Sequence, residues 1–412
     1  MGMKTFQQEV VSGGTQRPID PDATPDRTNA VIGLLAWLAL FAYLAWRSPW
    51  MVVFALGIAV SITAHEWGHY WTAKRSGMKA TQFFLGFGPR IWSTHRNGME
   101  WGVRAIPLGG FVKIIGMTNV DEVDPADEAV TYRQGSYPRR MWVITAGSVM
   151  HLILAFAIIV PVYAFAGQVR STDTVEIWGV EPDTPAAEAG LREGDIVRTI
   201  DGVTMAGADQ FRTTLAALEP GATVQLGVER DGALLTLTAT LVQHPKFTET
   251  RGYLGVQSTD EQRTSLGLGD ALVQGPKDLF RGVGQAIVGV SKVINPVNVW
   301  GHLVGTNDDY TSRPGTFVGA TSVSKDVGEF DGWAGILSLL AVVNLSVGVF
   351  NMFPLLPLDG GHAAIATYER LRSRRGKRYY ADVNKLMPVA AVCIALLAFM
   401  FLTGLYLDIA KG

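Results

Sequence analysis

The chain has 412 residues, of which 48% are hydrophobic and only 17% are charged. Soluble globular domains usually carry about 25% charged residues, so this composition favours a membrane protein. The formal net charge of −2 removes any general argument for nucleic-acid binding, because a row of phosphates requires a surplus of basic side chains. The single cysteine, Cys393, excludes a disulfide framework and a cysteine zinc site within one chain.

Five apolar segments approach or exceed the length of about 20 residues that a helix needs to cross a bilayer core. They are residues 29–46, 50–69, 141–167, 334–358 and 388–407. The polar residues 1–28, with Gly-Gly and several prolines, are predicted to form a disordered tail. A cleaved signal peptide is the alternative for the first segment, but that segment follows a long tail and no small-residue cleavage motif comes after it.

Basic residues mark the connections that we expect in the cytoplasm. The loop 74–140 and the segment 370–385 are both rich in lysine and arginine, and the positive-inside rule places such loops on the cytoplasmic side. With five spans, the tail is then cytoplasmic and residues 168–333 are extracytoplasmic. Long domains can cross a membrane regardless of charge, so this second placement depends on the neighbouring loops.

Residues 78–117 alternate apolar and polar side chains in short runs bounded by glycine. The runs are residues 81–85, 90–94, 99–106 and 111–115. This pattern predicts β-hairpins in the cytoplasmic loop, at the membrane face.

Residues 168–245 contain four strand-like runs separated by glycine, proline and Asp-Gly, which predicts a compact α+β module. Residues 246–333 are expected to form an extracytoplasmic linker with amphipathic helices. From Asp270 to about Gly305 basic residues recur at helical spacing. This stretch fits an interfacial helix, or an ordinary amphipathic helix packed against the soluble module.

The second apolar segment ends in His65-Glu66-Trp67-Gly68-His69, which has the HExxH spacing. On a helix this spacing sets two imidazoles one turn apart on one face, where both can reach a single metal. A catalytic zinc typically keeps three protein ligands and a water whose pKa it lowers toward about 7. Glu66 is the candidate to accept the proton of that water. The alternative is a group of polar residues that reach toward lipid headgroups.

A third ligand is expected at the end of the fourth segment, in the run from Asn351 through Pro354 and Pro357 to Asp359-Gly-Gly361. Prolines and glycines at membrane depth break helical hydrogen bonds, which is tolerated only where the chain is buried or lines a watery cavity. The predicted topology brings the ends of the second and fourth segments to one side of the membrane. Asp359 is therefore the candidate partner of His65 and His69.

Together these motifs resemble the site-2 protease family of intramembrane zinc metalloproteases, over nearly the whole chain after about residue 50. Further points of likeness are Phe84-Leu-Gly-Phe-Gly-Pro89, Pro107-Leu-Gly-Gly-Phe111 and Gly348-Val-Phe-Asn351. The run Pro185-Ala-Ala-Glu-Ala-Gly-Leu-Arg-Glu-Gly-Asp195 is similar to PDZ domains, so the likeness is closest to the PDZ-containing actinobacterial members.

The resemblance implies a polytopic α-helical membrane protein with a β-hairpin region and one extracytoplasmic PDZ-like domain. It implies that His65, His69 and Asp359 hold Zn²⁺, that Glu66 activates water, and that Asn351 assists near the substrate carbonyl. Such proteases act in regulated intramembrane proteolysis. They cut the membrane anchors of single-span proteins such as anti-sigma factors, which another protease has often trimmed outside the cell.

Three functions of individual parts stay open. The hairpin region either pairs with an unwinding substrate or only caps the site, and the PDZ-like domain either binds peptide by strand addition or only limits access. Where many relatives have Gly-Pro-x-x-Asn, this chain has Gly147-Ser-Val-Met-His151. His151 is expected to hydrogen-bond to a neighbouring helix rather than to face the substrate.

The first apolar segment goes beyond the four-helix plan of the family, and its role is open. Two other classes of protein remain alternatives to the protease: a metal-binding membrane transporter or sensor, and a non-catalytic membrane scaffold. The chain shows no halves related by a repeat, as many transporters do, which argues against the first alternative.

Overall fold

The computed structural model describes residues 27–117, 121–243, 251–373 and 377–410. The chain divides into two compact units. The membrane unit comprises residues 1–162 and 272–412, and the second unit is Tyr163–Ala271. Nearly all of the predicted disordered tail, residues 1–28, lies outside the described residues.

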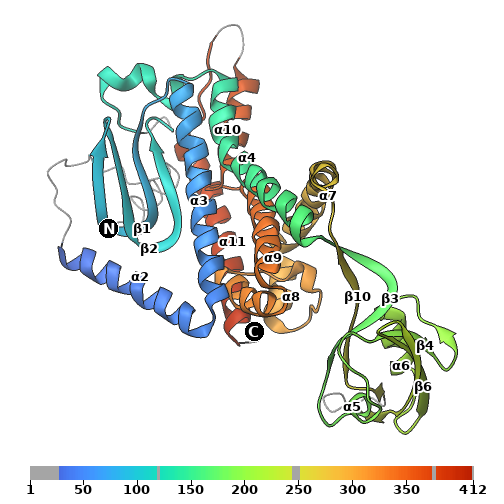
Figure 1. Ribbon diagram of the computed structural model, residues 1–412. Helices are drawn as coiled ribbons and strands as arrows, with labels where there is room; N and C mark the ends of the chain where they lie inside the picture. Colours follow the sequence, from blue (N-terminus) through green and yellow to red (C-terminus); the bar gives the residue numbers. More distant parts are fainter. Residues whose placement is uncertain (1–26, 118–120, 244–250, 374–376, 411–412) are drawn as a thin grey trace. The chain divides into compact units, whose positions relative to one another are not determined.

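Five helices of the described residues are long and apolar enough to cross a membrane, as the sequence predicted. They are α2 (Arg27–Arg47), α3 (Pro49–Arg75), α4 (Tyr137–Pro161), α9 (Phe317–Asn351) and α11 (Val383–Ala410) (Figure 1). Ser48 separates the first two, since its hydroxyl accepts a hydrogen bond from the backbone N–H of Trp50 and Pro49 occupies the first helical position. The chain is thus a multi-pass membrane protein.

Helix α9 differs from the predicted fourth segment, 334–358, at both ends. It starts earlier, at Phe317, where the hydroxyl of Thr316 caps it, and it ends at Asn351. Gly332 interrupts it with φ 58° and ψ −141°, a conformation that favours glycine. The residues before this kink are too polar for hydropathy to predict a membrane helix there. The prolines after Asn351 prevent the helix from continuing.

Helices α3, α4 and α9 contact one another and form the centre of the membrane unit. Phe54 of α3 packs with Ile336 and Leu340 of α9 in a buried cluster. The approach is close, because a Cβ added to Gly57 would lie 2.5 Å from Cδ1 of Leu340. This packing fixes which face of α3 is turned inward.

The predicted hairpin region forms two long antiparallel strands, β1 (Ala80–Arg96) and β2 (Met99–Ile114). Both strands bend, so that Phe84 pairs with Phe111 on one side and with Gly102 on the other. The four predicted runs are the straight parts of these two strands. The run at the end of β2 has a pairing neighbour on one side only and is a free edge within the described residues.

The second unit is built on a six-stranded sheet with the order β10-β3-β4-β6-β7, in which β5 pairs with β4 alone. The strands are β3 (Gln168–Val180), β4 (Ile196–Ile200), β5 (Val203–Thr204), β6 (Thr223–Arg230), β7 (Ala233–Thr240) and β10 (Val256–Thr264). Helices α5 (Pro185–Glu188) and α6 (Ala208–Ala216) complete its buried core.

This unit extends beyond the predicted module 168–245, because β10 lies in the predicted linker 246–333 and pairs with β3. The sequence of β10, VQSTDEQRT, does not alternate apolar and polar residues, so hydropathy could not predict this strand.

The predicted amphipathic region contains α7 (Leu268–Ile294) and α8 (Pro296–Val304). Most of α7 belongs to the membrane unit rather than to the soluble module. A Cβ added to Gly275 would lie 3.0 Å from Val160 of α4, and one added to Gly282 would lie 2.6 Å from Leu345 of α9. Small residues thus let α7 lie close against two spanning helices.

Candidate metal centre

Three of the predicted site residues meet in the membrane unit. Helix α3 presents His65 and His69 one turn apart, and Asp359 is the first residue of α10 (Asp359–Arg372). The two Nε2 atoms are 3.1 Å apart, and Oδ2 of Asp359 lies 3.5 Å from Nε2 of His65 and 3.4 Å from Nε2 of His69. Both imidazoles are buried.

These distances fit a zinc ion. Zinc–nitrogen bonds of about 2.0–2.1 Å in a tetrahedral site place the donor atoms roughly 3.3–3.4 Å from one another. Oδ2 of Asp359 is buried, and beyond the two imidazoles no hydrogen-bond donor contacts it in the described part of the chain. A buried carboxylate oxygen without a partner is costly, and a cation between the three donors removes that cost. The three residues could therefore hold Zn²⁺.

Helix α4 orients the imidazoles. Nδ1 of His69 lies 2.7 Å from the carbonyl oxygen of Val143, to which it donates its proton, so Nε2 is left with the lone pair that a metal requires. One turn further along α4, a Cβ added to Gly147 would lie 2.3 Å from Cε1 of His65 and 2.5 Å from Nε2 of His69. Glycine is the only residue that fits at this position without displacing both candidate ligands.

Two glycines place Asp359. A Cβ added to Gly360 would lie 2.2 Å from the carbonyl oxygen of Phe353, and one added to Gly361 would lie 2.9 Å from the carbonyl carbon of Leu355. The turn after α9 therefore folds tightly over the first residues of α10, as the Asp-Gly-Gly sequence allows. This contact brings Asp359 back to the level of the histidines.

Glu66 is half-buried between α3 and the free edge of β2. The backbone of Val112 hydrogen-bonds to its carboxylate, and a Cβ added to Gly110 would lie 3.3 Å from its Cγ. The carboxylate of Glu66 thus lies against β2, on the residue that directly follows the candidate ligand His65.

Asn351 is the last residue of α9 and is half-buried. Among the described residues no hydrogen bond or ion pair joins it to His65, His69 or Asp359. Its predicted role near the substrate carbonyl stays a prediction.

His151 of α4 makes the expected hydrogen bond to a neighbouring helix. Its Nδ1 lies 2.8 Å from Oδ1 of Asn344, and Nδ2 of Asn344 donates to Oγ of Ser61 at 3.0 Å and to the carbonyl of Leu340 at 2.8 Å. The hydroxyl of Ser61 donates its proton to the carbonyl oxygen of Gly57, so it can only accept a hydrogen bond from Asn344. The amide is thereby oriented, and His151 carries its proton on Nδ1.

The ring of His151 also lies 5.0 Å from the ring of His65, centroid to centroid. Asn344 and Ser61 had no signal of their own in the sequence, although Ser61 precedes His65 by one helical turn. Through His151, these two residues link the metal cluster to a neighbouring cavity.

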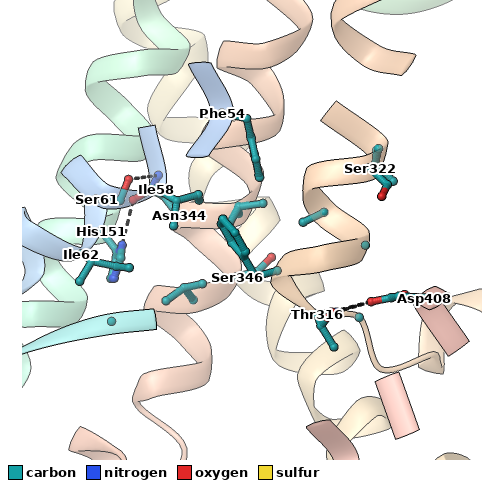
Figure 2. A pocket seen from close by; sticks show the side chains of 18 of the residues that line it. Phe54, Ile58, Ser61, Ile62, His151, Thr316, Ser322, Asn344, Ser346 and Asp408 are labelled. Atoms are coloured by element: carbon teal, nitrogen blue, oxygen red, sulfur yellow. Dashed lines mark hydrogen bonds between the residues drawn. The ribbon is translucent and has the colours of Figure 1, made fainter. Parts of the chain in front are cut away.

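That cavity has a volume of about 890 Å³, and Figure 2 shows it from close by. His151, Asn344 and Ser61 lie at one part of its wall, and Thr316 and Asp408 lie at another. Pro107 and Gly109 of β2 also line it, and most of the remaining wall is apolar. The cavity thus adjoins the metal cluster through His151 and has the lining that a hydrophobic segment requires.

Comparison with known proteins gives matches over most of the chain. The zinc metalloprotease Rip1 of Mycobacterium tuberculosis (strain H37Rv) is 34% identical over 393 residues, which cover 86% of this chain and 95% of that protein. The Rip1 zinc metalloprotease of Mycolicibacterium smegmatis is 30% identical over the same shares of both chains. Among solved structures, the PDZ domain of an SdrC-like protein from Listeria monocytogenes is 23% identical with a TM-score of 0.20, and the match covers 22% of this chain and 93% of that one.

The profile of peptidase family M50 matches residues 53–397, which include both candidate histidines, the glutamate between them and Asp359. The chain therefore belongs to peptidase family M50 and is an intramembrane zinc metalloprotease.

Proposed function

We propose that the chain hydrolyses peptide bonds in the transmembrane segments of single-span membrane proteins, at a zinc ion held by His65, His69 and Asp359. The observation that carries this proposal is the set of three donor atoms within 3.1–3.5 Å of one another beside an apolar cavity. A protease that cuts membrane segments needs both a centre that activates water and a hydrophobic space that binds the segment.

The chain's own residues have separate tasks. When zinc is bound it acidifies water and polarises a peptide carbonyl. Glu66, next to His65, accepts the proton of the attacking water and passes it to the leaving amine. Asn351 assists near the substrate carbonyl, as the family resemblance implies.

The substrate lies in the cavity and extends along the free edge of β2. A helical peptide bond is sterically hidden, so the segment must become extended before it is cut. The edge run of β2 has a strand partner on one side only and lies beside Glu66, which suits pairing with an extended chain. The alternative function of the hairpin is a cap that excludes water from the site.

Substrates of the anti-sigma-factor type, trimmed outside the cell by another protease, follow from the family resemblance. The second unit, as a PDZ-like domain, either binds the trimmed end by strand addition or blocks untrimmed proteins. The basic residues of the loops 74–140 and 370–385 support a cytoplasmic site and an extracytoplasmic second unit.

A comparison of cells that carry the wild-type chain or Glu66→Gln tests the proposal. The variant is expected to retain zinc and to accumulate single-span stubs in the membrane proteome, because the ligands remain and the proton acceptor is lost. Glu122→Gln, which changes an exposed glutamate in the loop after β2, is the matched control and should leave the stubs at wild-type levels. Stub levels in Glu66→Gln cells equal to those of the wild type would overturn the mechanism.

A further inference from the structure

A second cavity, of about 400 Å³, lies in the membrane unit at the far end of α10 from Asp359. The start of α4, the last turns of α10 and the chain just before α11 enclose it. Its polar wall includes Arg133, Ser136, Arg140, Glu369, Arg370 and Arg378. The volume is in the usual range of small-ligand sites, of about 300–1,000 Å³.

The wall carries more positive than negative charge. Glu369 is its one carboxylate within the described residues, and this group is already engaged. Its Oε2 lies 2.7 Å from Nη2 of Arg140, and its Oε1 accepts the backbone N–H of Ala381 at 2.8 Å. Arg133 in turn is paired with Glu128, which lies outside the wall. Two of the four arginines therefore have carboxylate partners.

Arg370 and Arg378 contact no carboxylate in the part of the chain that the structure describes. Arg378 donates one hydrogen bond, to the carbonyl oxygen of Gln134 at 2.9 Å, and both side chains are exposed. Guanidinium groups bind phosphate oxygens through two parallel N–H donors, which makes a pair of them a suitable phosphate site. The charge of the wall thus predicts an anionic ligand.

The position of the cavity indicates which anion reaches it. Tyr137, at its wall, is the first residue of the spanning helix α4, and Tyr380 stands shortly before the last candidate span, which starts at Lys385. Tyr379 also lines the cavity. The ends of spanning helices and their tyrosines lie at the level of lipid headgroups, where the phosphates of the bilayer are concentrated.

We propose that this cavity binds the phosphate of an anionic phospholipid, with Arg370 and Arg378 as its cationic partners. Free inorganic phosphate is the alternative ligand, because it carries the same phosphate group as the lipid. The site is independent of the zinc chemistry.

Native mass spectrometry of the purified full chain tests this site. The protein in detergent is titrated with phosphatidylglycerol, with phosphatidylcholine of the same acyl chains, and with inorganic phosphate. Phosphatidylglycerol is expected to bind with at least about tenfold higher affinity than phosphatidylcholine. The double variant Arg370→Gln/Arg378→Gln should lose this preference, since both exposed side chains can change without disturbing the buried Arg140–Glu369 pair.

The control variant Arg139→Gln/Lys385→Gln removes the same charge at the same membrane level from two exposed residues outside the wall, and it should keep the preference. Equal binding of the two lipids, or an equal loss in both double variants, would refute a specific site. Binding of inorganic phosphate as tight as that of phosphatidylglycerol would overturn the assignment to a lipid. Zinc content should be unchanged in both variants, which separates this test from that of the protease mechanism.

Discussion

The carbonyl oxygen of Val143 lies 2.7 Å from Nδ1 of His69, so a backbone group of α4 determines which nitrogen of a candidate ligand on α3 can face the metal. Backbone carbonyls and carboxylates commonly hold metal-binding histidines in this way. The metal centre therefore depends on the packing of α4 against α3 as much as on the HExxH motif. This dependence can be tested away from the ligands themselves.

Gly147→Ala is expected to remove most of the bound zinc. Its Cβ would lie 2.3 Å from Cε1 of His65 and 2.5 Å from Nε2 of His69, which forces either the two rings or α4 to move. Metal analysis of the purified variant should show a loss of most of the bound zinc, and cleavage of a tagged substrate should fall by the same proportion.

Ser148→Ala is the matched control for that substitution. It changes the next residue of α4, whose buried hydroxyl has no hydrogen-bond partner among the described residues, and it should retain zinc and activity. Full zinc occupancy in Gly147→Ala would contradict the structure of the site.

Removal of zinc by a chelator is expected to stop cleavage and to be reversed by added Zn²⁺. His65, His69 and Asp359 are the donors that hold the ion in the proposed mechanism, so its loss removes the group that activates water. The measurement is the rate of cleavage in detergent before chelation, after it, and after readdition. Undiminished cleavage by a metal-free sample would show that the site is not catalytic.

Asn344→Leu is expected to lower both stability and activity. Asn344 is buried and joins His151 to Ser61, and hydrogen bonds between membrane helices contribute about 0.6 kcal/mol on average and up to about 1.7. The thermal midpoint in detergent and the cleavage rate measure the two effects. Asn344→Asp, which keeps an acceptor for His151, should recover part of the activity. Ser338→Ala, in the same helix but outside the cavity wall, should change neither quantity.

The second unit is expected to lose stability in acid through Asp195. Burial raises the pKa of this carboxyl, but hydrogen bonds from Arg230 and from the backbone N–H of Arg192 outweigh burial and hold the pKa below its ordinary value. A pKa that is lower in the folded state gives stability above the unfolded-state pKa. That stability is lost as the pH falls through the folded-state value.

Hydrogen exchange of the amides in β4 and β6, corrected for the intrinsic pH dependence, measures this effect in the full chain. Asp195→Asn should speed exchange at neutral pH and flatten its acid dependence, because the charge is gone at every pH. Asp209→Asn, which changes an exposed aspartate of the same unit, should leave the profile as it is. An unchanged profile in Asp195→Asn would refute the role of the ion pair.

Much of the metal centre was predictable, because its residues follow local rules. The spacing of His65 and His69 places them on one helical face whatever surrounds the helix. The prolines and glycines around Asp359 identify a broken helix at membrane depth, which is rare without a function. The five spanning helices follow from hydropathy in the same way.

The contacts between helices could not be predicted. The close approach of Gly147 and the hydrogen bond of Asn344 depend on the rotation of each helix about its axis, and a helix that is apolar on all sides carries little information about that rotation. The start of α9 and the strand β10 were missed because both are polar in sequence, and tertiary contacts rather than hydropathy determine their structure.

Asp359 follows the whole second unit in the chain, whereas both histidines come long before it. A growing polypeptide therefore contains two of the three donors while the whole second unit is made, and it acquires the third donor only afterwards. A copy that ends before Asp359 would lack the third donor of the candidate zinc site. The order of the motifs along the chain thus makes completion of the metal site depend on prior synthesis of the second unit.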